Sequence, residues 1–210
     1  MTIVQRLMRG TGRAGLVFIA LLPVGGCALT ADSVNLAYSP TSQNVAPVAG
    51  AENVNVTVSV SDVRPDKLVV SRKRDAHGYE MAPIVAKNDP AATVSGAITT
   101  DLRNRGFKTE GGGVRLGVGV TNFYCDFSVG LLGVGAKAVS TVAFSVHIER
   151  PDGSIAYNKS ITGTNTTKKF NMITNGANAK VSLEGALADA VGKLMSDTAF
   201  TTALVEAGTR

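Results

Sequence analysis

The chain has 210 residues, of which 44% are apolar and 18% are charged, as expected for one globular domain with a leader. The formal net charge is +5, but three of the 21 basic residues (Arg6, Arg9 and Arg13) precede an apolar run typical of export signals. Without them, 18 basic residues face 16 acidic ones, and a net charge of +2 gives no support to nucleic-acid binding.

Residues 1–26 have the layout of a signal peptide. A basic start is followed by the apolar run Leu16–Val24 and then by Gly25 and Gly26. As a helix this run would rise only about 14 Å, which is too short for a hydrocarbon core of about 30 Å. We therefore expect a cleaved signal rather than a permanent membrane span.

The sequence Val24-Gly25-Gly26-Cys27 resembles a bacterial lipobox. The resemblance implies that Cys27 becomes an acylated N-terminus that carries fatty acids such as palmitate, and two or three acyl chains anchor a protein firmly to a bilayer. Ala28, in place of Asp, favours the inner leaflet of the outer membrane, with the domain facing the periplasm. The alternative is an ordinary secretory signal followed by a structural cysteine.

Residues 27–52 are polar and contain Pro40 and Pro47, so we expect a flexible tether, although Leu36–Tyr38 is suited to docking as a short strand. The domain is predicted to span residues 53–210. It begins with a strand in which valines at 54–60 alternate with polar residues. The charged residues 62–79 read as a loop or a loose hairpin.

A helix is predicted to begin at Asn88-Asp89-Pro90, which supplies a cap and a proline for the first turn. Val94, Ile98 and Leu102 form its apolar face. Gly106 is expected to end it in a left-handed conformation, and Phe107 to pack back on Leu102.

Three alternating segments follow and read as an antiparallel meander. In the first, apolar residues fall at even positions over 114–120 and at odd positions over 123–127, which predicts a bulge or a face switch near Asn122. Residues 142–148 and 155–161 form the other two strands. An apolar stripe from Leu183 to Leu194 predicts a helix, and Ser196-Asp197 is suited to capping a second, short one.

The predicted order is β-α-β-β-β-α. We expect an α+β two-layer sandwich, with a mostly antiparallel sheet and helices on one face.

Segments spread over the expected mature chain resemble the YajG family of bacterial lipoproteins. These segments are LAYSPT at 36–41, VNVTVSVSDVRPDK at 54–67, APIV at 82–85, LRNRGF at 102–107 and SDTAF at 196–200. The resemblance implies a small periplasm-facing domain tethered to a membrane. The family supplies no catalytic residue to carry over, and its biochemical role is poorly defined.

The cysteines and histidines favour neither a metal nor a cofactor. Cys125 lies in a strand-like run and reads as a buried thiol, and His77 and His147 stand at no ligand spacing. The Gly-rich runs fit neither phosphate-binding pattern, and neither paired carboxylates nor a G-x-S-x-G elbow are evident. We therefore expect a non-catalytic protein and do not expect a small-molecule partner.

Two features suggest contacts with other molecules. Arg72, Lys73 and Arg74 form a candidate anion contact, for which the alternative is a solvated loop balanced by nearby aspartates. Leu131, Leu132 and Val134 form an apolar hairpin tip that either contacts a partner or lipid, or packs into the core.

The leading hypothesis is an anchored accessory module with an envelope protein as partner. The alternative is a lipid- or lipopolysaccharide-binding accessory of a transport system.

Overall fold

The computed structural model describes residues 30–41, 45–75, 77–129, 136–150, 152–169 and 175–209. The strands are β1 (Asp32–Val34), β2 (Val56–Asp62), β3 (Val69–Arg74), β4 (Glu80–Ala86), β5 (Val114–Val129), β6 (Ala136–Glu149) and β7 (Ile155–Lys169). The helices are η1 (Ala51–Asn53), a 3₁₀ turn, and α2 (Pro90–Asn104), α3 (Gly176–Ser196) and α4 (Thr198–Gly208).

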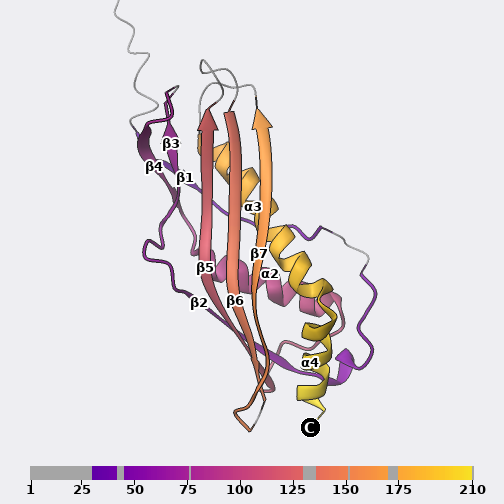
Figure 1. Ribbon diagram of the computed structural model, residues 1–210. Helices are drawn as coiled ribbons and strands as arrows, with labels where there is room; N and C mark the ends of the chain where they lie inside the picture. The colour runs from indigo at the N-terminus through magenta and orange to yellow at the C-terminus, as the bar shows by residue number, and fades with distance from the viewer. Residues whose placement is uncertain are drawn as a thin grey trace, which may run out of the picture.

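The predicted meander is confirmed. β5, β6 and β7 are neighbours and pair antiparallel along most of their length (Figure 1). The register of β5 against β6 shifts between Val120 and Asn122, which is the bulge that the change of parity indicated. Val120 before the bulge and Phe123 after it are both buried, so both halves of the long strand direct apolar residues to the same side of the sheet.

The predicted helix ends are also confirmed. Asp89 caps α2 by accepting a hydrogen bond from the N–H of Ala91, at 2.8 Å, and Pro90 occupies the first turn. Gly106 has a φ of 92°, and the N–H of the next residue, Phe107, donates to the carbonyl of Leu102. Asp197 caps α4 in the same way as Asp89 caps α2.

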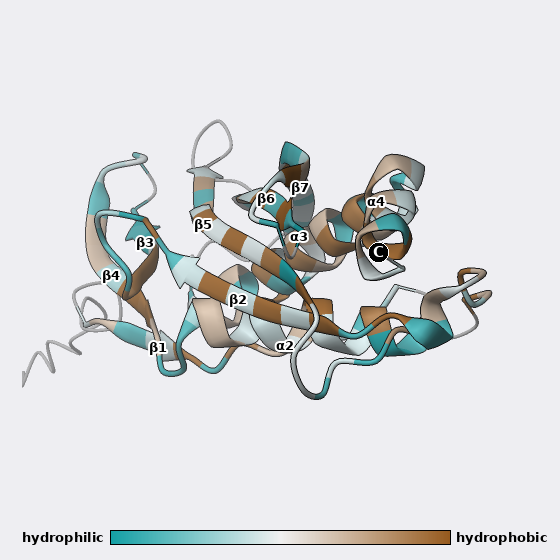
Figure 2. Cartoon of the chain, turned by 90° about the horizontal axis from the view of Figure 1, so that it is seen from below, coloured by the Kyte–Doolittle hydropathy of each residue, from teal (hydrophilic) through white to brown (hydrophobic). Residues whose placement is uncertain are grey.

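Helices cover one face of the sheet, and the other face is open. Figure 1 shows α2 crossing behind the long strands and α3 running beside β7. At Gly163 of β7 the approach of α3 is so close that a Cβ atom would lie 2.2 Å from the carbonyl oxygen of Ala186. Figure 2 shows β2 alternating between apolar and polar residues, so one side enters the core and the other meets solvent.

The sheet is mixed, which corrects the expectation of a mostly antiparallel one. It has seven strands in the order β1-β4-β3-β5-β6-β7, with β2 also paired to β5. β2 and β3 run parallel to β5, and β1 runs parallel to β4. The predicted element order β-α-β-β-β-α lacks the short strands β1, β3 and β4. β3 lies within residues 62–79 and pairs antiparallel with β4, which begins at Glu80, so of the two alternatives for this region the hairpin is the one observed. The partner of β1 is distant in sequence and β3 is rich in charged residues, so local patterns conceal these two strands.

Part of the described stretch of residues 27–52 packs against the sheet. Val34 and Leu36 are buried, and β1 pairs with β4. The side chain of Asn88 accepts from the N–H of Leu36 and donates to its carbonyl. Docking near Leu36–Tyr38 therefore occurs, with the strand itself four residues earlier, at Asp32–Val34.

Candidate functional site

Four of the residues singled out from the sequence lie outside the described part of the chain. They are Cys27, the expected lipidation site, and the apolar tip residues Leu131, Leu132 and Val134. The strand ends that flank this tip are described, and Val129 of β5 pairs with Ala136 of β6.

Arg72, Lys73 and Arg74 lie on β3, but they do not converge on one site. Arg74 donates to Asp126 at 2.9 Å and to Glu80 at 3.2 Å, and the guanidinium of Arg72 lies 3.8 Å from the other carboxylate oxygen of Glu80. Both arginines therefore already have carboxylate partners on the outer side of the strand. This arrangement corresponds to the balanced alternative rather than to a three-residue anion site.

Lys73 points into the protein. The residue is only 4% exposed, and its ammonium nitrogen lies 3.1 Å from a carboxylate oxygen of Asp32. The other oxygen of Asp32 accepts from the N–H of Gly176, the first residue of α3, at 3.0 Å. Asp32 thus ties the N-terminal strand both to β3 and to the positive end of a helix.

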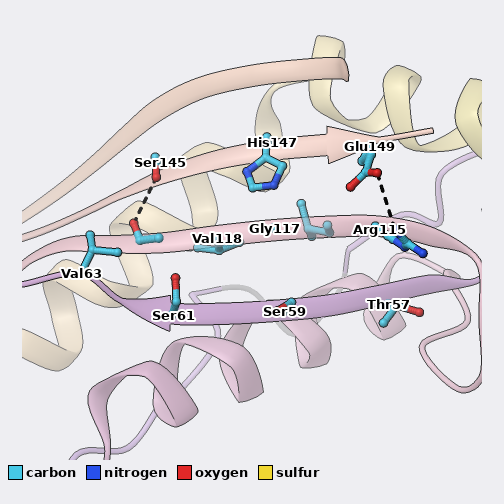
Figure 3. A pocket seen from close by; sticks show the side chains of 12 residues that line it. Thr57, Ser59, Ser61, Val63, Arg115, Gly117, Val118, Ser145, His147 and Glu149 are labelled. Atoms are coloured by element: carbon cyan, nitrogen blue, oxygen red, sulfur yellow. Dashed lines mark hydrogen bonds and ion pairs between the residues drawn. The ribbon is translucent and has the colours of Figure 1, made fainter. Parts of the chain in front are cut away.

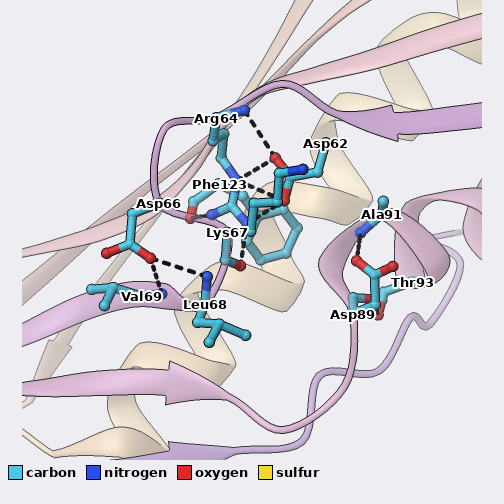
Figure 4. Close-up of polar contacts among 10 residues, drawn as sticks. All are labelled: Asp62, Arg64, Asp66, Lys67, Leu68, Val69, Asp89, Ala91, Thr93 and Phe123. Carbon is cyan, nitrogen blue, oxygen red and sulfur yellow. Dashed lines mark hydrogen bonds and ion pairs between the residues drawn. The ribbon is translucent and has the colours of Figure 1, made fainter.

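Arg64, a buried residue outside the predicted anion contact, stabilises the turn between β2 and β3. Arg64 forms an ion pair with Asp62, at 2.6 Å, and donates to the carbonyls of Phe123 and Lys67 (Figure 4). Its guanidinium also lies 5.8 Å from the ring centroid of Phe123. Burial alone would raise the pKa of Asp62, but the hydrogen bonds and charge of Arg64 outweigh it and lower that pKa. The sequence signal was an aspartate two residues before an Arg-Pro pair.

The open face of the sheet carries a polar depression of about 470 Å³ over β2, β5 and β6 (Figure 3). Its floor is β5 at Gly117 and Gly119, where a Cβ atom would lie 2.2 Å from the ring of His147 and 2.8 Å from the hydroxyl of Ser145, respectively. The hydroxyl-bearing residues Thr57, Ser59 and Ser61 of β2 line the opposite side. The two glycines thus create the depression by leaving space along the middle strand.

The groups in this depression are not arranged for nucleophilic catalysis. The hydroxyl of Ser145 donates to the carbonyl of Gly119 at 3.5 Å, rather than to His147. Glu149 forms an ion pair with Arg115 at 3.5 Å, and the side chain of Arg115 is largely exposed. The surface offers hydroxyl, imidazole and guanidinium groups to a polar partner.

The two edges of the sheet beside this face differ. Along β7 the N–H of Thr164 donates to Asp189 of α3 at 2.8 Å, and the carbonyl of Thr162 accepts from Lys193 at 3.1 Å. Asp189 and Lys193 also pair with each other at 2.8 Å. Side chains of α3 therefore occupy two outward-facing backbone groups near the middle of this edge, at Thr162 and Thr164.

β2 is open along its middle. Asn55 accepts from Val114 and Val63 donates to Val120, so the odd-numbered residues of β2 bond to β5. The N–H and C=O groups of Val58 and Val60 therefore point away from β5, and no residue in the described part of the chain bonds to them. Their side chains are only partly buried, whereas Leu116 beside Val58 is fully buried.

Cys125 is a buried free thiol, as predicted. Burial raises its pKa, and nearby serine hydroxyls offset this only in part, so the thiolate form is disfavoured. Within the described ranges, no group of three or more His, Cys, Asp or Glu side chains is placed to hold a metal ion. No helix in those ranges is both long and apolar enough to cross a bilayer.

Comparison with known proteins agrees with the lipoprotein interpretation. A family described as "Uncharacterized lipoprotein" matches residues 40–205. A crystal structure from Xanthomonas campestris shares 12% identity at a TM-score of 0.52, covering 82% of this chain and 96% of its own. A Caulobacter crescentus protein described as a candidate lipoprotein shares 12% identity at a TM-score of 0.44, covering 74% and 93%. No curated protein matches significantly in sequence. With most of its length matched by the family, the chain belongs to the YajG family of uncharacterised lipoproteins.

Proposed function

We propose that this lipoprotein is a non-catalytic interaction module, anchored through acylated Cys27 to the inner leaflet of the outer membrane and facing the periplasm. It binds a protein of the envelope whose extended segment adds to the open edge of β2. The carrying observation is a contrast between the edges: side chains of α3 bond to Thr162 and Thr164 near the middle of β7, while the outward groups of Val58 and Val60 have no partner among the described residues. Free N–H and C=O groups on an edge strand are what an added strand recognises.

The open stretch of the β2 edge has the length of a short added strand. Lys108 accepts from Val56 and so closes the start of the edge, and β2 ends at Asp62. A partner strand of about four or five residues fits between these points. The hydroxyls of Thr57 and Ser59 lie on the open face next to it, where they are suited to hydrogen-bond polar side chains of the partner.

The lipid- or lipopolysaccharide-binding alternative has less support. In that alternative Arg72, Lys73 and Arg74 lie near a groove of lipid size beside Leu131 and Leu132, two residues outside the described ranges. Lys73 is buried against Asp32, and both arginines have carboxylate partners.

The proposal is tested by photo-crosslinking in the native envelope. A photoreactive residue at Ser59, beside the open edge, is expected to give one discrete protein adduct, and one at Thr162, beside the closed edge, none. Val58→Pro removes the outward N–H while leaving the bonds to β5, so it should abolish the adduct. Val58→Thr keeps the N–H in a side chain of similar size and should retain it. An adduct that survives Val58→Pro, or equal adducts from both positions, would contradict strand addition.

A further inference from the structure

Asp32, at the start of β1, is firmly held in the domain. Asp32 is fixed by its ion pair with buried Lys73, by the N–H of Gly176 and by the pairing of β1 with β4. Only four residues lie between it and Cys27, and the five steps from one Cα to the next span at most about 18 Å. This inference rests on the proposed acylation of Cys27. Given that anchor, the end of the domain that carries Asp32 lies within about 18 Å of the lipid headgroups.

The same end carries the end of β5 and the start of β6. Ser71 of β3 lies beside Cys125, so Lys73 and its partner Asp32 lie near the level of Phe127. Lys137 of β6 is paired with Ser128, one residue further along β5. In Figure 1 these strand ends, with β1 and β3, lie at the top of the molecule, and α4 lies at the bottom.

Two lysines face each other at this end without an acidic partner. Lys137 of β6 lies directly opposite Lys168 of β7, and both side chains are exposed on the open face. Within the described residues neither forms an ion pair, whereas Lys159 and Lys193 lower on the molecule each pair with an aspartate. Like charges directly opposite on neighbouring strands repel each other, and an anion between them relieves that repulsion.

We propose that this end of the domain rests on an anionic bilayer surface, with Lys137 and Lys168 contacting the phosphates of phospholipid headgroups. Basic residues close to such a surface are attracted by the negative charge of the lipids. The strands then stand upright from the membrane. Val58 of β2 lies beside Leu116 of β5, which in turn lies opposite Ile148 of β6. Ile148 is 11 residues along β6 from Lys137, so the open edge of β2 is held about 35 Å from the bilayer.

The test uses the acylated full-length protein in vesicles of phosphatidylcholine with about 30% phosphatidylglycerol, with a nitroxide on the headgroups. A fluorophore is placed on Ser128→Cys, opposite Lys137, or on Asn158→Cys, an exposed position near the other end of the same face. Acylation blocks Cys27 and burial protects Cys125, so the introduced thiol takes the label. Quenching at position 128 is expected to exceed that at 158 at least threefold.

Charge dependence separates this inference from anchoring alone. K137E/K168E, or vesicles of phosphatidylcholine only, should reduce quenching at 128 at least twofold, while K108E, an exposed lysine near the start of β2, should not. Equal quenching at the two positions, or quenching at 128 that ignores both changes, overturns the inference while Cys27 anchoring stands. A purified protein without acyl chains overturns the anchoring proposal and this inference with it.

Discussion

Asp32 and Lys73 form an ion pair, at 3.1 Å, across 41 residues of sequence, and this pair fixes the N-terminal strand to the sheet. The lysine is almost fully buried, whereas the aspartate side chain is about one-third exposed. The pair thus connects the segment nearest the expected anchor with the core of the domain.

Removing the aspartate charge should destabilise the domain. Asp32→Asn removes the carboxylate that lies 3.1 Å from the buried ammonium of Lys73, and we expect a loss of about 2 kcal/mol in the free energy of unfolding. Denaturant unfolding measures this loss. Asp32→Asn combined with Lys73→Met also removes the buried positive charge and should recover at least half of this loss. A double variant no more stable than the single one would show that the buried charge is not the cause.

Two glycine substitutions should have opposite effects. Gly163→Ala places a Cβ atom against the backbone of α3, and we expect a loss of at least about 3 kcal/mol or a failure to fold. Gly96→Ala, in α2 with no atom within 4 Å of the new Cβ, should stabilise by about 0.5–1 kcal/mol because alanine favours helices. Thermal unfolding of both variants checks the pair. Similar melting temperatures would contradict the packing of α3 on β7.

The Asp62–Arg64 pair should make stability depend on acid. The pKa of Asp62 is lower in the folded state than its ordinary value, so its contribution is complete above about pH 4 and is lost as the pH falls through the folded-state pKa. Asp62→Asn should cost about 1–3 kcal/mol at pH 7 and progressively less below about pH 4. Urea unfolding of both proteins at several pH values measures the difference. A constant difference down to about pH 2 would rule out this linkage.

The closed edge of β7 should open when its side-chain partners are removed. Asp189→Ala combined with Lys193→Ala leaves the N–H of Thr164 and the carbonyl of Thr162 without partners. We expect a loss of about 1–2 kcal/mol and concentration-dependent self-association. Sedimentation shows the association, and Lys180→Ala, which removes another lysine of α3, serves as the control. A variant that remains as monomeric as the control would argue against a protective role for the two side chains.

The sequence was most informative where structure is local. The alternation of 114–120 and 142–148, the Asp89-Pro90 cap and Gly106 each act within a few residues, and each was predicted correctly. β3 was concealed because Arg72 and Arg74 give it the composition of a loop, and their carboxylate partners lie on other strands. The pairing of β2 with β5 joins segments separated by a hairpin and a helix, so no local pattern indicates that it is parallel.

The candidate surfaces were harder to predict. The depression forms where two glycines of β5 lie between the hydroxyl side chains of β2 and the polar side chains of β6. The open edge depends on which strand lies at the border of the sheet. Both follow from topology rather than from any motif. Lys73 is the opposite case. It lies between two arginines in the sequence, but the alternation of β3 directs its side chain into the core, where it pairs with Asp32.

The anchoring of the domain is tested most directly by growing cells with labelled palmitate and following the chain into the membrane fraction. The account predicts that the protein carries the label, that Cys27→Ser abolishes the label and releases the protein from the membrane, and that Cys125→Ser changes neither. An unlabelled protein, or a Cys27→Ser variant that stays fully membrane-bound, would contradict it.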